Sequence, residues 1–191
     1  MSDPVVIPGA RDVRARLDTP DADALVVACP PHPQYGGSRS DPRLRAVSHA
    51  LAPDVACLRF DYGPWDDGEG ERRDAERAIS WARERFERVG LFGYSFGAGV
   101  ALRAAADEDS LAACAVLAPP GDGAILDAVD AVACPLQVVY GERDDTVDWN
   151  PVVTRARELN HTVESLPADH HFAGQQDRVG GLVAGFFGHH L

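Results

Sequence analysis

VGLFGYSFGAGVALRAAA, residues 89–106, changes character in its middle, and that change decides the fold. Residues 89–94 are a short apolar run of the kind that becomes a buried parallel strand, whereas residues 98–106 are rich in helix formers. The GYSFG motif around Ser95 lies between them. At such a strand-to-helix turn, glycines on both sides of a serine allow a tight bend that projects the hydroxyl above the sheet. The stretch therefore predicts a nucleophilic serine, with a packed glycine turn that carries no chemistry as the alternative.

The same alternation of strand and helix patterns continues along the rest of the chain. Short apolar runs bounded by glycine and proline predict strands, the first two forming an antiparallel start, at 5–7, 13–17, 24–29, 55–60, 89–94, 111–118, 136–141 and 162–166. Helical spacing of apolar residues and runs of helix formers predict helices at 42–52, 71–89, 98–106, 122–133, 150–160 and 179–187. We therefore expect an α/β fold over residues 1–191, a single domain whose mostly parallel central sheet has helices on both faces.

The charge of the chain is strongly negative, with 30 acidic and 18 basic residues and a net charge of −12. Nucleic acids and anionic membranes are poor partners for such a surface. Every basic residue in that count is arginine, and none is lysine. We favour a halophilic protein, whose self-repulsion is screened by molar salt, over an ordinary acidic protein from a GC-rich genome. The sequence shows neither a secretory signal nor an apolar run long enough to span a membrane, so we expect a cytoplasmic location.

The four cysteines lie within or next to apolar runs, at Cys29, Cys57, Cys114 and Cys134. No two of them have the CxxC spacing that is typical of zinc or redox sites. We therefore expect reduced thiols in the core, and neither a bound metal nor a cofactor.

Acidic and imidazole side chains follow two later strand runs. The carboxylates after the run at 136–141 are Asp144, Asp145 and Asp148. The histidines near the last strand run are His161, His170 and His171. A carboxylate at the end of a strand can orient an imidazole, and an imidazole can accept the proton of a serine hydroxyl. Because His170 and His171 are adjacent, their side chains point in different directions and at most one can be the base. His161 is the weaker alternative.

Four further motifs occur in order along nearly the whole chain: PHPQYGG at 31–37, RFDY at 59–62, GERD at 141–144 and ADHHF at 168–172. With these motifs and GYSFG, the sequence resembles the small, capless serine hydrolases of the dienelactone-hydrolase-like group, within the α/β-hydrolase superfamily. In that group the four motifs follow the third, fourth, seventh and last strands. The resemblance implies the α/β-hydrolase fold without a cap domain.

The resemblance also implies roles for single residues. Ser95 aligns with the nucleophile, Asp144 with the acid and His170 with the base. The group builds its oxyanion hole from backbone N–H groups, which here implies Phe96 and a residue of the PHPQYGG loop, with Gln34 preferred to Tyr35. True dienelactone hydrolases have a cysteine in place of the serine, so their particular substrate is not implied.

The pocket is expected to be open, because residues 119–135 are too few to form a lid domain. The acidic run DYGPWDDGEGE replaces the Arg-Gly-x-Gly-x-Ser element that the group usually has after its fourth strand. If the loops run as in relatives, the residues around the pocket are Tyr35, Tyr62, Trp65, Tyr94 and Phe172.

We therefore expect a serine hydrolase that cleaves a carboxylic ester or related small acyl compound through an acyl-enzyme. Acyltransferase, thioesterase and peptidase activities use the same groups and stay open, because a fold does not identify a reaction. A non-catalytic binding protein on this scaffold is an alternative of a different class, and a metal-dependent enzyme that uses the histidines is a third. The oligomeric state is not readable from the sequence.

Overall fold

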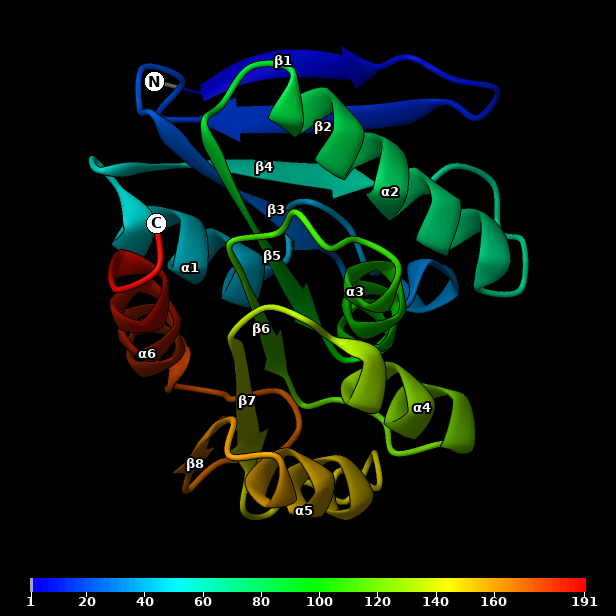
Figure 1. Ribbon diagram of the computed structural model, residues 1–191, viewed down its shortest axis with the longest axis vertical. Helices are drawn as coiled ribbons and strands as arrows, with labels where there is room; N and C mark the ends of the chain where they lie inside the picture. Colours follow the sequence, from blue (N-terminus) through cyan, green and yellow to red (C-terminus); the bar gives the residue numbers. More distant parts are fainter. Residues whose placement is uncertain (1) are drawn as a thin grey trace.

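The computed structural model describes residues 2–191, in which one eight-stranded sheet lies between two layers of helices (Figure 1). The strands are β1 (Ser2–Ile7), β2 (Val13–Asp18), β3 (Ala24–Cys29), β4 (Val55–Asp61), β5 (Arg88–Tyr94), β6 (Ala113–Leu117), β7 (Leu136–Gly141) and β8 (Thr162–Leu166). The helices are α1 (Pro42–Leu51), α2 (Glu69–Arg83), α3 (Phe96–Ala106), α4 (Gly123–Ala131), α5 (Asn150–Glu158) and α6 (Gln176–Gly188), with a short 3-10 helix η1 (Pro33–Tyr35).

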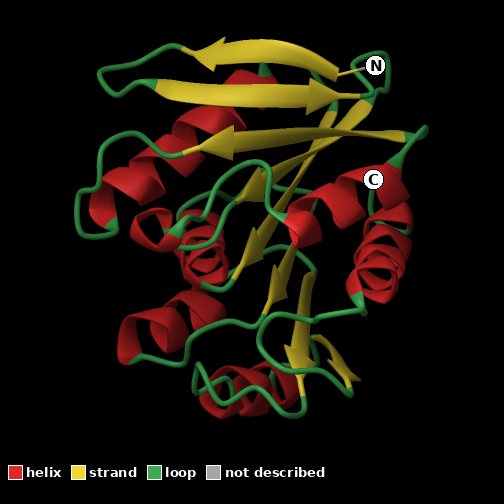
Figure 2. Cartoon of the chain, turned by 180° about the vertical axis from the view of Figure 1, so that it is seen from behind, coloured by secondary structure: helices red, strands yellow, loops and turns green. Residues whose placement is uncertain are grey.

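The strand order in the sheet is β1-β2-β4-β3-β5-β6-β7-β8. Strand β2 is antiparallel to β1 and to β4, and all the other pairs are parallel. Helices α2, α3, α4 and α5 pack on one face, and α1 and α6 pack on the other (Figures 1 and 2). Every residue of β3, β6 and β7 is therefore buried, which explains the unbroken apolar sequences of β3 and β6 and the single polar residue, Gln137, of β7.

The predicted α/β-hydrolase fold is confirmed, and the element boundaries differ by a few residues. Helix α2 ends at Arg83, before the predicted end at residue 89, because the chain has already entered β5 at Arg88. Helix α6 begins at Gln176, three residues before its predicted start. The connection between β6 and β7 contains only α4, so residues 2–191 include no cap domain there.

The four cysteines are buried and unpaired, as predicted. Burial raises the pKa of Cys57 to about 12, so this thiol stays protonated at neutral pH. Among residues 2–191, no group of three or more His, Cys, Asp or Glu side chains is arranged to hold a metal ion. No helix in this part of the chain is long and apolar enough to cross a membrane.

Because β5, β7 and β8 run parallel, their carboxyl ends lie at the same edge of the sheet. These strands end at Tyr94, Gly141 and Leu166. Ligand and catalytic sites of open α/β sheets gather at this edge. The loops after the three strands carry the side chains that the sequence analysis selected as nucleophile, acid and base.

Candidate active site

Ser95 occupies a strained turn between β5 and α3. Its backbone angles are φ 57° and ψ −121°, a region that residues other than glycine rarely adopt. A Cβ atom at Gly93 would overlap the carbonyl oxygen of Gly97, and a Cβ atom at Gly97 would overlap the carbonyl oxygens of Cys29 and Pro30. The two glycines of GYSFG are therefore required by close backbone approaches, and the turn holds Ser95 at the end of the strand.

Ser95, His170 and Asp144 form one hydrogen-bonded chain. Ser95 Oγ lies 2.9 Å from His170 Nε2, and His170 Nδ1 lies 2.7 Å from Asp144 Oδ2. The side chain of Asp144 is fully buried, and that of His170 is 7% exposed. A carboxylate can only accept hydrogen bonds, so Nδ1 carries the proton and Nε2 is left to accept from the serine hydroxyl. This is the arrangement of a general base that activates a serine.

The loop after β7 holds the Asp144 carboxylate by its second oxygen. Asp144 Oδ1 accepts the backbone N–H groups of Thr146 at 2.9 Å and Val147 at 3.3 Å. With one oxygen used by the backbone and the other directed at His170, the carboxylate has little freedom to rotate. Asp145 and Asp148, the sequence alternatives, are not part of this chain of hydrogen bonds.

The alternative histidines lie elsewhere. His171 is exposed, and its ring centroid is 5.5 Å from that of His170 in an edge-on arrangement. It lines the cavity described below but does not bond to Asp144 or Ser95. His161 precedes β8, at the opposite end of that strand, and burial lowers its pKa.

Ser95 and His170 open into a cavity with a volume of about 730 Å³. Its lining residues are Pro31, His32, Tyr35, Gly36, Gly37, Asp41, Arg43, Tyr94, Ser95, Phe96, Pro120, Asp122, Thr146, Val147, His170 and His171. The loop after β3, the N-terminus of α1, the serine turn and the loops after β6, β7 and β8 all contribute. A cavity of this size accommodates a small organic molecule next to the serine.

Three of the five predicted pocket residues do not line this cavity. Phe172 is fully buried in the core beneath α1 and α6. Tyr62 is 8% exposed, and its hydroxyl donates to the carbonyl of Pro30 at 3.1 Å. Trp65 is not among the lining residues and stacks on His32, with 4.5 Å between ring centroids. That part of the prediction is corrected, while Tyr35 and Tyr94 do line the cavity.

Of the two predicted oxyanion donors, the structure brings only Phe96 to the cavity. The first intrahelical bonds of α3 come from Ala98 and Gly99 to Ser95 O, so the N–H of Phe96 is left for a ligand. The N–H of Gln34 instead donates to His32 Nδ1 at 3.3 Å, and Gln34 is not a lining residue. Tyr35, the alternative, donates its N–H to His32 O at 3.1 Å.

The cavity wall also contains an ion pair that was not predicted from the sequence. Asp41 caps α1 by accepting the N–H of Arg43, and its Oδ2 lies 2.6 Å from Arg43 Nη2. The Arg43 guanidinium also lies 4.5 Å from the centre of the Tyr94 ring. Burial raises the pKa of Asp41, against the opposing charge of Arg43. The sequence Asp-Pro-Arg was the available signal, since aspartate followed by proline is typical of a helix start.

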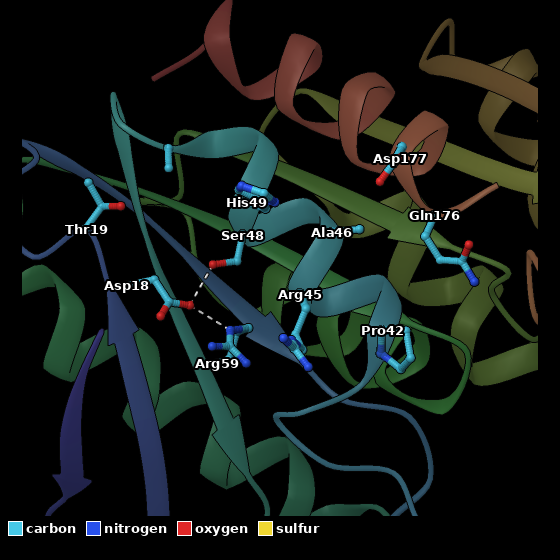
Figure 3. Close-up of a pocket in the computed structure, with 11 residues that line it drawn as sticks. Asp18, Thr19, Pro42, Arg45, Ala46, Ser48, His49, Arg59, Gln176 and Asp177 are labelled. Atoms are coloured by element: carbon cyan, nitrogen blue, oxygen red, sulfur yellow. Dashed lines mark hydrogen bonds and ion pairs between the residues drawn. The ribbon is translucent and has the colours of Figure 1, made fainter. Parts of the chain in front are cut away.

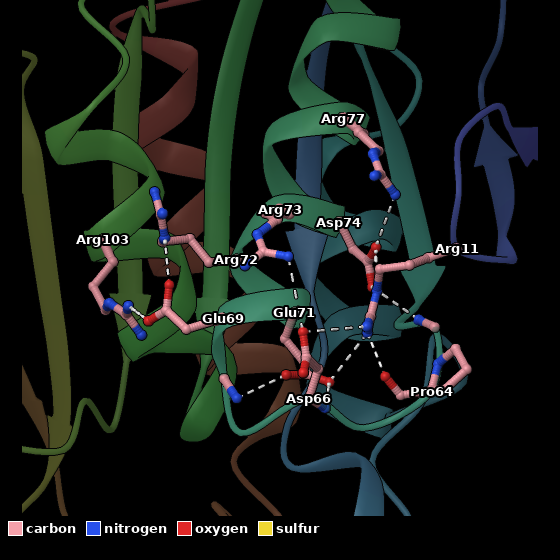
Figure 4. Close-up of polar contacts among 12 residues, drawn as sticks. Arg11, Pro64, Asp66, Glu69, Glu71, Arg72, Arg73, Asp74, Arg77 and Arg103 are labelled. Carbon is pink, nitrogen blue, oxygen red and sulfur yellow. Dashed lines mark hydrogen bonds and ion pairs between the residues drawn. The ribbon is translucent and has the colours of Figure 1, made fainter.

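A buried charge cluster shapes the loop between β4 and α2 (Figure 4). Glu71 and Asp74 are fully buried, and Arg11 lies between them, with Nε 2.9 Å from Asp74 Oδ1 and Nη2 3.3 Å from Glu71 Oε1. Glu71 accepts the N–H groups of Asp66 and Gly68. Part of the acidic run is therefore buried, and its hydrogen bonds fix the loop that carries Trp65.

A second cavity, of about 480 Å³, lies beside α1 and away from the serine (Figure 3). Asp18 Oδ2 accepts Ser48 Oγ at 2.6 Å and Arg59 Nε at 2.7 Å there. Burial alone would raise the pKa of Asp18, but hydrogen bonds from Arg59, Ser2 and Ser48 hold it below its ordinary value. None of the triad residues lines this cavity. Its polar contacts join β2, β4 and α1 to one another.

Comparisons with known proteins agree with this fold. The chain is 23% identical to an alpha-beta serine hydrolase homologue from Coxiella burnetii, with a TM-score of 0.85 and 96% of each chain covered. It is 23% identical to dienelactone hydrolase from Anabaena variabilis, with a TM-score of 0.84 over 100% of this chain and 98% of that one. A serine hydrolase without a lid from Xanthomonas campestris is 24% identical, with a TM-score of 0.81 and coverage of 95% and 91%. Because these sequence identities are low, the three structures show only that the fold is shared.

The family of the chain follows from its sequence. The chain is 36% identical over 105 residues to the quorum-quenching protein AidA of Acinetobacter baumannii, which is 46% of this chain and 34% of AidA. The match thus spans about a third of the length of that relative. The sequence pattern of the dienelactone hydrolase family matches residues 66–184, more than half of the chain, including the serine turn and the loops after β7 and β8. The chain therefore belongs to the dienelactone hydrolase family.

Proposed function

We propose that the protein is a serine hydrolase that cleaves a carboxylic ester, or a related small acyl compound, through an acyl-enzyme. The observation that carries the proposal is the unbroken chain of hydrogen bonds from Ser95 Oγ through His170 to the buried Asp144 carboxylate, opening into a cavity. A serine hydroxyl is a weak nucleophile until a positioned base takes its proton.

In the acylation step, Ser95 Oγ bonds to the substrate carbonyl carbon while its proton passes to His170 Nε2. Asp144 stabilises the imidazolium that forms. The carbonyl oxygen becomes an oxyanion, which the N–H of Phe96 and the N-terminus of α3, beginning directly after Ser95, would stabilise. The tetrahedral intermediate collapses as the bond to the leaving alcohol breaks, and the Nε2 proton goes to that alcohol.

Deacylation repeats these steps with water. Water attacks the acyl carbon, and its proton goes to His170 Nε2. The bond to Ser95 Oγ then breaks, the serine recovers a proton from the imidazolium, and the carboxylic acid leaves. His170 Nε2 carries the proton in both acylation and deacylation, so these proton transfers need no other side chain.

The cavity supports a small substrate that reaches the serine from solvent. Its volume of about 730 Å³ fits a molecule of modest size, and no inserted domain of residues 2–191 covers it. Hydrolysis of thioesters or small peptides, and acyl transfer to an acceptor other than water, would use the same three side chains. The substrate class is therefore decided by assay.

Turnover of a panel of short and aromatic esters, thioesters and an amide tests the proposal. Ser95→Ala should lower kcat on the best substrate by a factor on the order of 10⁶, while the melting temperature changes little. Ser110→Ala is the matched control, because Ser110 is exposed and bonds only to Glu108. Ester turnover that survives Ser95→Ala would contradict the proposal.

A further inference from the structure

His170 takes part in a third hydrogen bond, which has no role in the hydrolytic steps above. The hydroxyl of Tyr94 donates to the backbone carbonyl of His170 at 3.0 Å. Tyr94 is 1% exposed, so no competing solvent surrounds this bond. Other bonds hold the loop upstream of the histidine: Arg143 N–H donates to Ala168 O at 3.0 Å, and Arg143 Nη2 donates to Pro167 O at 2.6 Å.

Tyr94 is also the residue directly before Ser95 in the chain. Its backbone ends β5 and begins the serine turn, while its side chain reaches the loop after β8. One residue is therefore bonded covalently to the nucleophile and by a hydrogen bond to the backbone of the base. The distance between Ser95 Oγ and His170 Nε2 depends on both attachments.

We infer that Tyr94 is a positioning residue of the reaction, which sets the distance between base and nucleophile through its hydroxyl bond to the His170 carbonyl. The inference rests on the proposed function. An error of about an ångström between reacting groups lowers rates strongly, which is why such a bond matters for turnover as well as for stability.

The surroundings of Tyr94 hold its ring in one orientation. The Arg43 guanidinium lies 4.5 Å from the ring centre, and the Arg43 side chain is itself anchored to Asp41. A cation over an aromatic face is attractive and restricts rotation of the ring. Burial raises the pKa of Tyr94 to about 12, so the hydroxyl keeps its proton and remains a donor over the whole range in which a histidine base works.

Tyr94→Phe is the direct test, because it removes the hydroxyl and keeps the ring under Arg43. We expect kcat on the best ester to fall about tenfold, the equivalent of one buried hydrogen bond, with KM changed less than twofold. Tyr94 also lines the cavity, so a change in the cavity wall would alter KM, whereas a loss of positioning lowers kcat.

Tyr140→Phe is the matched control. Tyr140 is 9% exposed, its hydroxyl accepts from Arg157 Nη2 at 3.2 Å, and it makes no hydrogen bond to Ser95, His170 or Asp144. Both variants lose one tyrosine hydroxyl bond, so their melting temperatures should fall by similar amounts, while only Tyr94→Phe loses kcat. Equal kcat in Tyr94→Phe and the wild type, or equal losses in the two variants, would overturn the inference.

A readout that needs no turnover keeps this test independent of the proposed function. The Nδ1 proton of His170, hydrogen-bonded to Asp144, is expected as a far-downfield proton NMR signal in the wild type. That signal should shift or broaden in Tyr94→Phe and stay unchanged in Tyr140→Phe. A wild type without ester turnover would remove the proposed function, whereas an unchanged signal in Tyr94→Phe would remove the role of Tyr94.

Discussion

Gly97 is a residue at which one added carbon atom would disturb the serine turn. Gly97→Ala adds a Cβ that would overlap the carbonyl oxygens of Cys29 and Pro30, and backbone atoms cannot move aside as side chains can. We expect a loss of at least about 3 kcal/mol in the free energy of unfolding and a large fall in turnover, since the overlap displaces the serine turn from the end of β3. Chemical denaturation and ester assays measure both effects.

Gly185→Ala serves as the control at the residue scale. Gly185 lies inside α6, and a Cβ there would meet no atom within 4 Å. The free energy of unfolding should rise by about 0.5–1 kcal/mol, because alanine loses less conformational freedom in a helix than glycine does. If Gly97→Ala were as harmless as Gly185→Ala, the close packing of the serine turn would be wrong.

At the scale of elements, Arg11 connects the turn between β1 and β2 to the start of α2. Arg11→Ala would remove the guanidinium beside the fully buried carboxylate of Glu71 and would leave that of Asp74 with only the longer contact to Arg77, at 3.6 Å. Removing one member of a buried charge cluster costs about 3–5 kcal/mol, and we expect a loss of that size in the free energy of unfolding. Denaturant titration of the purified variant measures it.

Arg14→Ala provides the comparison for Arg11. The Arg14 side chain is 70% exposed and pairs with the equally exposed Asp12 at 3.6 Å. Exposed pairs contribute little, so the free energy of unfolding should change by less than about 0.5 kcal/mol. Equal effects of the two substitutions would contradict the importance of the buried cluster.

At the scale of the whole molecule, the net charge of −12 opposes the compact state through self-repulsion. Molar KCl screens charges over distances of about 3 Å, compared with about 10 Å in 0.1 M salt. We expect the melting temperature to rise steadily between low and molar KCl, as for a halophilic protein. A melting temperature that did not rise with KCl would contradict the halophilic interpretation.

Local sequence pattern predicted the fold and the strand ends at which the candidate nucleophile, acid and base lie, whereas the choice of Asp144 and His170 among neighbouring carboxylates and histidines came from the family resemblance. Ser95, Asp144 and His170 each follow an apolar strand run, and parallel strands bring their ends together. The path of the loop between β4 and α2 could not be predicted in this way. It depends on Arg11, more than fifty residues upstream, so Trp65 was expected to line the pocket and instead stacks on His32, which does line it.

In the PHPQYGG loop, too, the sequence did not reveal which contacts form, here between residues only two positions apart. Gln34 was expected to offer its N–H to the substrate, but that group is used within the loop by His32 Nδ1. A side-chain acceptor two residues away competes with any ligand for a backbone donor, and spacing alone does not reveal which acceptor wins.

Fluorophosphonate labelling of the folded protein in molar KCl, with the adduct located by mass spectrometry, tests the central claim most directly. Such a reagent bonds covalently only to an activated serine. We expect a single adduct at Ser95 that disappears in His170→Ala and persists in His171→Ala, since only His170 bonds to both Ser95 and Asp144. Folded wild-type protein that takes up no label at Ser95, or a His170→Ala variant that labels as fast as the wild type, would contradict the account.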